Sequence, residues 1–160
     1  MSNGFEKSNT EGNINFIIVE IDIKEEDINK EIRIINSFDE MKRIYGWEDE
    51  YVDNKDENEK EIKKNIKIKI DDLYLPSFAY HHKFDKAGKH IIQYSFKNNL
   101  TNISYLFNGC KSITKIDFTN FNTQNLNKVD GLLSFCDSLK KKNVITSNNQ
   151  ILEELIHVKK

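Results

Sequence analysis

An internal repeat after residue 99 constrains the fold of this 160-residue chain more than any other feature. The segment 100–113 aligns without gaps with 126–139, so that Cys110 matches Cys136 26 residues later. A period of roughly 20–29 residues is typical of leucine-rich repeats, in which each copy forms one coil that stacks on the next. Because neighbouring strands lie about 4.8 Å apart, equivalent residues of stacked coils form columns. The two cysteines are therefore expected at the same place in adjacent coils.

The first copy is the better preserved one and reads LTNISYLFNGCKSITKIDFTNFNTQN over 100–125. It follows the pattern N-V-T-N-M-S-x-M-F-x-G-C-x-S-L-T-x-I-D-L-S-x-F-N-T at Thr101, Asn102, Ser104, Phe107, Gly109, Cys110, Ser112, Thr114, Ile116, Asp117, Phe121, Asn122 and Thr123. This stretch resembles the BspA-like leucine-rich repeat. The second copy keeps Cys136, Ser138 and Leu139 but loses the second half of the pattern, so it is expected to be degenerate.

The family resemblance also carries expectations about function. The strand-rich segment before the repeats is similar to the region that precedes such repeats in protist proteins. Members of this family act as recognition modules and are not enzymes in their repeats. The resemblance therefore implies binding through the repeat surface, and it leaves the identity of the partner open.

Alternating apolar and polar residues predict β-strands in the first 98 residues. In 14–24, Val19, Ile21 and Ile23 face one side, as in a half-buried strand. With 31–35 this segment is expected to form a hairpin closed by a loop of several residues. A further strand is expected over 62–70, and Pro76 then indicates a strand end.

A second hairpin is expected over 78–96 because two aromatic-rich strands flank a turn with Gly88. Tyr80 and Tyr94 lie on these strands, which suggests a platform for a carbohydrate or another small molecule. His82 and His90 are expected to be neighbours across the turn, an arrangement that suggests a metal site or a pH switch. A third ligand is missing, so cross-strand packing of these histidines and of His81 is the favoured interpretation.

One short helix is expected within this region. Ser37 and Glu40 form a capping box, and Gly46 is a typical end for a helix that runs through about Tyr45. The acidic segment 48–61 that follows fails the test for a calcium loop because it lacks the turn glycine, with lysine in place of a ligand. It is expected to be a flexible, solvated loop.

Aromatic residues flank this acidic loop and give the first candidate contact surface. Tyr45, Trp47 and Tyr51 belong to it, and aromatic residues are enriched at protein interfaces. The alternative is that Trp47 packs the loop against the β-rich part of the chain.

Composition and charge exclude several classes of function. A net charge of −2 is unlike the basic footprint of nucleic-acid-binding proteins, and no apolar run approaches the length of a membrane span. The chain has 20 asparagines, part of which we attribute to codon bias. Two cysteines are too few for a disulfide framework, and without a signal peptide the protein is expected to be soluble and intracellular, most simply cytoplasmic.

Cys110 and Cys136 remain candidates for a disulfide or a metal ligand pair, although buried free thiols are the favoured interpretation. No histidine has a spacing that ties it to either cysteine, and no phosphate loop, zinc motif or nucleophile elbow is present. We therefore expect no enzyme activity, no catalytic residue, no metal site and no cofactor. A metal-dependent enzyme that uses the histidines stays a weak alternative.

The expected architecture is a mostly β, α+β fold in four parts. They are a lead-in over 1–13, a β-rich domain over 14–98 with one helix and the acidic loop, two repeats over 99–146, and a capping helix over 147–160. The repeats are expected to form a short solenoid of about two coils that is closed by this helix. The expected function is a noncatalytic protein-binding or structural module, such as an accessory subunit of a larger assembly. A carbohydrate- or small-molecule-binding domain that uses 78–96 is the alternative.

Overall fold

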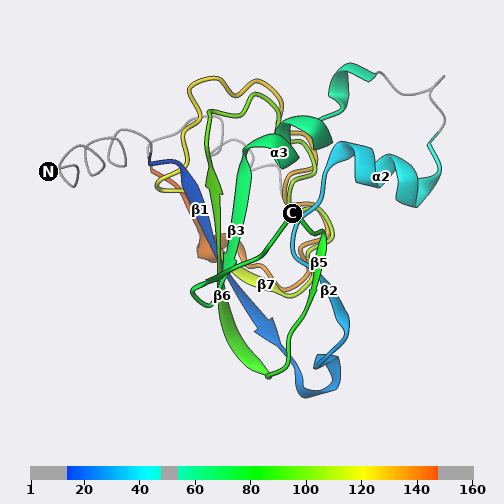
Figure 1. Ribbon diagram of the computed structural model, residues 1–160, viewed down its shortest axis with the longest axis vertical. Helices are drawn as coiled ribbons and strands as arrows, with labels where there is room; N and C mark the ends of the chain where they lie inside the picture. The colour runs from blue at the N-terminus through cyan, green and yellow to red at the C-terminus, as the bar shows by residue number, and fades with distance from the viewer. Residues whose placement is uncertain (1–13, 48–53, 148–160) are drawn as a thin grey trace, which may run out of the picture.

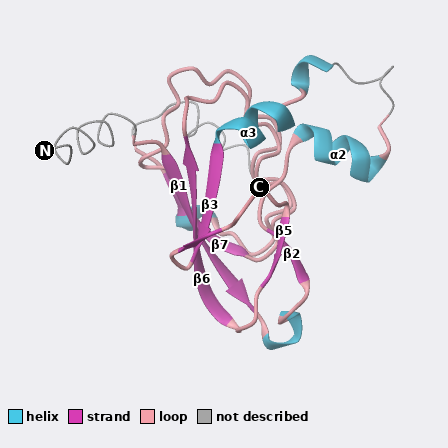
Figure 2. Ribbon diagram, in the orientation of Figure 1, coloured by secondary structure: helices cyan, strands magenta, loops and turns pink. Residues whose placement is uncertain are grey.

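The computed structural model describes residues 14–47 and 54–147, which form a mixed α/β fold (Figures 1 and 2). The strands are β1 (Phe16–Ile23), β2 (Glu31–Arg33), β3 (Ile66–Ile70), β4 (Leu73–Tyr74), β5 (His81–Lys83), β6 (Gly88–Phe96), β7 (Ile113–Asp117) and β8 (Val144–Ile145). The helices are α2 (Phe38–Tyr45) and α3 (Glu59–Asn65), with 3-10 turns η1 (Glu25–Asp27), η3 (Asn54–Asp56) and η4 (Lys141–Asn143).

A six-stranded sheet dominates the molecule, in the order β4-β3-β6-β1-β7-β8. All its neighbouring strands are antiparallel except β7 and β8, which are parallel. Alternation in β1 and β6 places one face of the sheet in the core, so that the odd-numbered residues of β1 from Ile17 and the even-numbered residues of β6 from His90 are buried. The same core continues from the sheet into the repeats as far as Val144.

Both hairpins predicted from the sequence are wrong in their pairing. β1 pairs with β6, from Phe16 opposite Ser95 to Ile23 opposite Gly88. β2 pairs with β5 in a separate two-stranded sheet. The chain over 16–33 thus runs antiparallel to 81–95 along its whole length, with a bend at η1 where the pairing passes from one sheet to the other.

The expected fold class, a β-rich domain joined to a short solenoid closed by a C-terminal helix, is wrong. β7 comes from the first repeat but pairs with β1, so it is an internal strand of the sheet that the N-terminal segments build. The second repeat adds only the two-residue strand β8 beside β7. The strand of the first repeat is therefore part of the main sheet. The described residues form a sheet-dominated α/β fold and not a separate solenoid.

The two repeat copies nevertheless lie side by side and run parallel. Asn102 and Lys128 form a parallel bridge, and Ile103 N–H donates to Lys128 O at 2.9 Å. Further bonds of 2.7–3.1 Å continue along the pair, from Tyr105 N–H to Asp130 O, Phe107 N–H to Leu132 O and Gly109 N–H to Ser134 O. Most of this region is loop and turn, as Figure 2 shows. The gapless alignment thus corresponds to a regular backbone contact.

The predicted helix over 37–45 is confirmed. The Ser37 side chain accepts a hydrogen bond from Glu40 N–H, and Gly46 ends α2 with a φ of 64°. The predicted loop over 48–61 is wrong where the structure describes it, because η3 covers Asn54–Asp56 and α3 begins at Glu59 and ends at Asn65, where loop and then strand were expected. Acidic residues in its first turn and Lys63 and Lys64 in its last turn suit the helix dipole.

Three expected segments lie wholly or partly outside the described residues. They are the lead-in over 1–13, the part of the acidic loop over 48–53, and all but the first residue of the capping helix over 147–160. Within 14–47 and 54–147, no helix is long and apolar enough to cross a lipid bilayer.

Candidate functional site

Four aromatic rings gather where α2 ends and the first repeat begins, and we call them the aromatic cluster (Phe38, Tyr45, Trp47 and Tyr105). The ring centroid of Phe38 lies 5.8 Å from those of both Trp47 and Tyr105. Trp47 meets Tyr105 edge-on at 6.3 Å, and Tyr45 stacks on Trp47 at 5.9 Å with an interplanar angle of 22°. Offset and edge-on contacts at such distances are favourable.

Two large apolar side chains at the end of α2 remain open to solvent. Ile44 is 49% exposed and Tyr45 is 58% exposed, whereas Phe38 and Met41 on the same helix are buried. We call Ile44 together with the aromatic cluster the α2 surface, of which Ile44 and Tyr45 are the exposed part. Two of the three aromatic residues proposed from the sequence, Tyr45 and Trp47, lie in it, and Tyr51 lies outside the described residues. Trp47 also packs against Phe38 of α2 and Tyr105 of the first repeat, and the adjoining part of the acidic loop, 48–53, lies outside the described residues.

Tyr105 is the member of the cluster that the sequence argument missed. Its φ is 62°, in the left-handed region that glycine favours, and its ring lies over Gly131, the equivalent residue of the second repeat. A β-carbon on Gly131 would lie 2.4 Å from Tyr105 Cε1. The reverse occurs four residues later, where the first repeat has Gly109 and the second has Phe135 at the equivalent position. Both of these residues also have a positive φ. The gapless alignment contained this signal.

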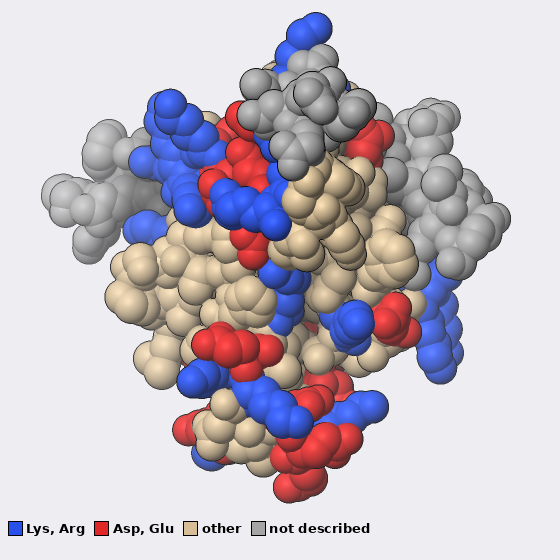
Figure 3. Space-filling view, turned by 90° about the vertical axis from the view of Figure 1, so that its right-hand side faces the viewer, with Lys and Arg blue, Asp and Glu red and all other residues tan. Residues whose placement is uncertain are grey.

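An ion-pair network holds α2 against its neighbours. Arg33 of β2 donates to Glu40 at 3.0 Å, and Arg43 bridges Glu40 at 2.9 Å and Glu59 of α3 at 2.5 Å. Hydrogen bonds from Arg43 lower the pKa of Glu59 to about 2, although burial opposes this. Burial also works against ionisation of Glu40, but the two arginines outweigh it and lower its pKa. Figure 3 shows acidic and basic side chains interleaved in its upper half, where the two helices lie.

A chain of hydroxyl groups extends this network into the fold. The Tyr80 hydroxyl donates to Glu59 Oε2 at 2.5 Å, so its proton is committed to that bond. Ser37 Oγ, 2.7 Å away, must then be the donor to Tyr80, while it accepts from Glu40 N–H. Burial and the bond to Glu59 raise the pKa of Tyr80. These hydroxyls are therefore structural donors and are not free to act as nucleophiles.

Buried asparagines join both helices to the first repeat. Asn58, 2% exposed, accepts from Phe38 N–H at 2.9 Å and donates to Ser104 O at 2.9 Å. Asn36, 1% exposed, donates to Asn108 O at 2.8 Å. These side chains fix the beginning of α2 on the repeat backbone, so the α2 surface has a rigid base.

Asp39 adds a second link between the helices. Its Oδ1 accepts from the N–H groups of Asn58 at 2.8 Å and Glu59 at 2.9 Å. A carboxylate of α2 thus caps the first turn of α3, where the free N–H groups and the helix dipole both favour a negative charge.

Phe84, Tyr94 and Phe96 are core residues, whereas Phe78 and Tyr80 are partly buried against the core. Tyr94 is fully buried, and its hydroxyl donates to Ile34 O at 2.6 Å. Phe84 and Phe96 are each 3% exposed. Arg33 and Lys63 lie against the ring of Tyr80, at 5.6 Å and 5.9 Å from its centroid. The two tyrosines proposed as a sugar platform therefore do not present free ring faces.

The three strand histidines separate into different sheets. His81 and His82 belong to β5 and pair with β2, whereas His90 lies in β6. His90 Nδ1 contacts Asp71 Oδ2 and Nε2 lies 2.8 Å from Lys86 O. A carbonyl oxygen only accepts, and so does an ionised carboxylate, which makes both ring nitrogens donors and the imidazole charged.

The groups around His90 and Asp71 account for the direction in which the pKa of His90 is shifted. Burial opposes the charge of His90, but the bonds to Asp71 and Lys86 outweigh it and raise its pKa. Asp85 also favours the charged form, while His82 is near enough to be affected by His90. The pair ties the turn between β3 and β4 to the turn before β6.

Cys110 and Cys136 are both buried and form no disulfide, as the favoured interpretation expected. Burial raises the pKa of Cys110 well above its usual value. Cys136 Sγ donates to Phe107 O at 3.0 Å. Because burial favours its protonated form, the Cys110 thiol is a poor nucleophile, since the thiolate is the reactive form.

The described residues contain no group of three or more His, Cys, Asp or Glu side chains that could hold a metal ion. What the geometry offers at the α2 surface is therefore exposed aromatic and aliphatic area on a rigid support. Comparisons of this chain with family models, with curated proteins and with solved structures found no match.

Proposed function

We propose that this chain is a noncatalytic protein-binding module and that its α2 surface contacts the partner. The observation that carries the proposal is the pair Ile44 and Tyr45, about half exposed on a helix whose other face is fixed by the cluster and the ion pairs. Tyrosine and tryptophan supply large contact areas at low entropic cost and are enriched among the residues that dominate binding energy.

The chemistry of the potential nucleophiles also supports a noncatalytic role. The Tyr80 hydroxyl is committed to Glu59, and the Cys110 thiol is held protonated by burial. Cys110 and Cys136 form no disulfide, which further supports a reducing, intracellular location for the protein.

The test is affinity purification from the source cell, compared between three forms of the full chain. A double variant, Ile44→Ser with Tyr45→Ser, removes the exposed part of the α2 surface and leaves its buried face intact. Phe135→Ser is the matched control, because Phe135 is 66% exposed and lies outside the α2 surface. We expect quantitative mass spectrometry to find proteins that co-purify with the wild type and the control but not with the double variant.

A purified partner then allows a direct measurement of affinity by calorimetry. We expect the double variant to weaken binding at least about 30-fold, which corresponds to the about 2 kcal/mol that defines an interface hot spot. Co-purification of the same proteins with the double variant and the wild type would contradict the proposal. Circular dichroism establishes that all three forms are folded.

A further inference from the structure

A second surface lies at the edge of the main sheet, on the outer side of β3. β4 pairs with β3 only at Lys69 and Ile70, and Leu75 N–H then donates to Ile68 O at 2.9 Å. The chain next turns away through Pro76 and Ser77. Among the described residues, no strand therefore pairs with the edge of β3 at Ile66 and Lys67.

The register of β3 shows which backbone groups point to this edge. Asn65 O accepts from Lys97 N–H, and Asp71 N–H donates to Ile91 O, so the odd-numbered residues of β3 bond to β6. In an antiparallel pair the bonding residues alternate along the strand. The backbone groups of Ile66 and Ile68 therefore point away from β6. Ile66 N–H donates to Ile62 O of α3 and Ile68 O accepts from Leu75 N–H, so Ile66 O and Ile68 N–H are the groups left to face the open edge.

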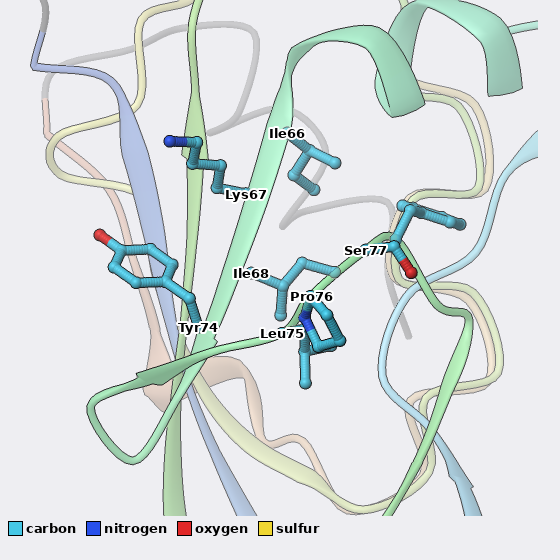
Figure 4. A pocket seen from close by; sticks show the side chains of 8 residues that line it. Ile66, Lys67, Ile68, Tyr74, Leu75, Pro76 and Ser77 are labelled. Carbon is cyan, nitrogen blue, oxygen red and sulfur yellow. The ribbon is translucent and has the colours of Figure 1, made fainter.

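A groove of about 340 Å³ lies along this edge (Figure 4). Its lining residues are Ile66, Lys67, Ile68, Tyr74, Leu75, Pro76, Ser77 and Phe78. Figure 4 shows Lys67 and Tyr74 on one side of β3 and Ile66, Leu75, Pro76 and Ser77 on the other. The groove thus has one apolar wall and one wall formed by Lys67 and Tyr74, and it shares no residue with the α2 surface.

The charge of the groove has one sign. Lys67 is exposed and is the one charged residue among the eight that line the groove. Lys63 Nζ lies 5.4 Å from the ring centroid of Phe78 at the end of the groove, but it is also 3.6 Å from Glu59 Oε2, so Lys67 is the cation that the occupant would meet. An occupant that follows the edge of β3 would meet a positive charge on one side and apolar side chains on the other.

We propose that this groove binds an extended peptide of alternating apolar and acidic residues, which adds a strand to the open edge of β3. A peptide N–H that donates to Ile66 O and a peptide carbonyl that accepts from Ile68 N–H would hold the peptide, as in other cases of strand addition. Its apolar side chains fit the wall formed by Ile66, Leu75 and Phe78, and its carboxylates fit Lys67. β3 itself alternates isoleucine and lysine, so the peptide is its charge complement.

Synthetic hexapeptides test the peptide chemistry by fluorescence anisotropy with the full chain. The probe is a fluorescein-labelled peptide of alternating valine and glutamate, and its control has lysine in place of glutamate. We expect saturable binding of the acidic peptide and none of the basic one. No saturable binding of the acidic peptide at about 1 mM would overturn the proposal.

Backbone methylation tests strand addition itself. One peptide carries N-methyl groups on its valines and another on its glutamates, because only one of these two sets points its amides toward β3. Exactly one of the two methylated peptides should lose binding. Equal behaviour of the two would contradict an added strand.

Protein variants locate the site. Lys67→Glu replaces an attraction with a repulsion, each worth about 0.2–1 kcal/mol or about 1.4- to 5-fold in affinity, so we expect binding about 2- to 25-fold weaker. Lys140→Glu changes the net charge equally at an exposed site in the second repeat and should have less than about a twofold effect. Ser77→Trp fills the groove without a change in charge and should abolish binding. Equal affinity of the Lys67→Glu and Lys140→Glu variants would place the peptide elsewhere.

This inference does not depend on the α2 surface. The double variant at Ile44 and Tyr45 should bind the acidic peptide as the wild type does, so failure of one proposal leaves the other intact. Thermal unfolding followed by circular dichroism confirms that each variant is folded.

Discussion

Replacement of Asn58 by alanine should destabilise the protein more than most single substitutions. The Asn58 side chain is 2% exposed and lies where α2, α3 and the first repeat meet. Its oxygen accepts from Phe38 N–H, and its amide nitrogen donates to Ser104 O, both at 2.9 Å. It also lies 3.3 Å from Asn102 O. Alanine would leave a donor and an acceptor without these partners.

The magnitude follows from the two groups that lose their bonds. A buried donor or acceptor without a partner costs about 1–3 kcal/mol, so Phe38 N–H and Ser104 O together cost about 2–6 kcal/mol. A domain of this kind is stable by about 5–15 kcal/mol. The substitution should therefore remove a large fraction of the free energy of unfolding.

The assay is urea unfolding followed by the fluorescence of Trp47, the one tryptophan in the chain. Trp47 packs against Phe38, whose N–H loses its partner in the variant, so the probe reports on the affected region. Asn125→Ala is the matched control, because Asn125 is exposed and such surface changes stay within about 0.5 kcal/mol.

A second variant separates hydrogen bonding from volume. Asn58→Asp keeps the size and the acceptor for Phe38 N–H but replaces the donor to Ser104 O with a carboxylate oxygen. At neutral pH we expect it to lose at least as much stability as Asn58→Ala, because two oxygens then face each other in a buried site. A loss below about 1 kcal/mol for Asn58→Ala, or wild-type stability for Asn58→Asp, would refute the reasoning.

Three further predictions concern strain and charge. Gly131→Ala should lower the free energy of unfolding by about 1–2 kcal/mol, because the new β-carbon would meet Tyr105 and the φ of residue 131 is 60°. Phe135→Gly should raise it by about 0.5–1 kcal/mol, because glycine relieves the positive φ of residue 135. Urea unfolding measures both changes. The pKa of Glu59 is lowered from 4.5 to about 2, so its stabilising effect is complete above pH 4.5 and is lost as the pH falls toward 2; Glu59→Gln should flatten the stability profile in that window. The pKa of His90 is raised, so its stabilising effect is present below pH 6.5 and is lost as the pH rises through the folded-state value; His90→Gln should flatten the profile there, and an unchanged profile would contradict the charged imidazole.

Local patterns predicted local structure well. Ser37 and Gly46 marked both ends of α2, because capping is settled by residues within one turn of the helix. The alternation of isoleucine in β1 marked the buried face of that strand for the same reason. α3 was missed because the isoleucines that follow it suggested a strand from Ile62, although β3 begins only at Ile66.

Pairing between strands could not be predicted from those patterns. β1 and β2 are neighbours in the sequence, as are β5 and β6, and each pair was expected to form a hairpin. Alternation states which face of a strand is buried but not which strand lies beside it. The connection between β1 and β2 is a 3-10 turn that bends the chain and is not a tight hairpin turn, so the pairing extends to β6 and β5.

The asparagines show where composition misled the interpretation. Codon bias predicts many asparagines, but it does not predict their place in the fold. Asn36, Asn58, Asn102 and Asn108 are at most 5% exposed, and among the described residues no buried side-chain polar atom lacks a hydrogen-bond partner. Their partners are mainly backbone groups of other segments, which the sequence does not identify.

The candidate site was predicted in its aromatic part and missed in its support. Tyr45 and Trp47 were proposed because they flank an acidic segment, which is a property of the sequence alone. Tyr105 joins them through a contact with Phe38 across more than 60 residues of chain. The exchange of tyrosine for glycine between Tyr105 and Gly131 was visible in the alignment, but its meaning depends on the positive φ at both positions.

That positive φ also bears on how the α2 surface would bind. A tyrosine in the left-handed region costs about 1–2 kcal/mol, and Tyr105 is held there by ring packing against Phe38 and Trp47 and by the space above Gly131. The ring contacts that offset the backbone strain at Tyr105 also restrict the motion of the rings of Phe38, Trp47 and Tyr105. A surface that is already ordered loses less conformational entropy when a partner binds. The strain at Tyr105 is therefore consistent with a preorganised contact site, in which Tyr45 is the residue that stays available to the partner.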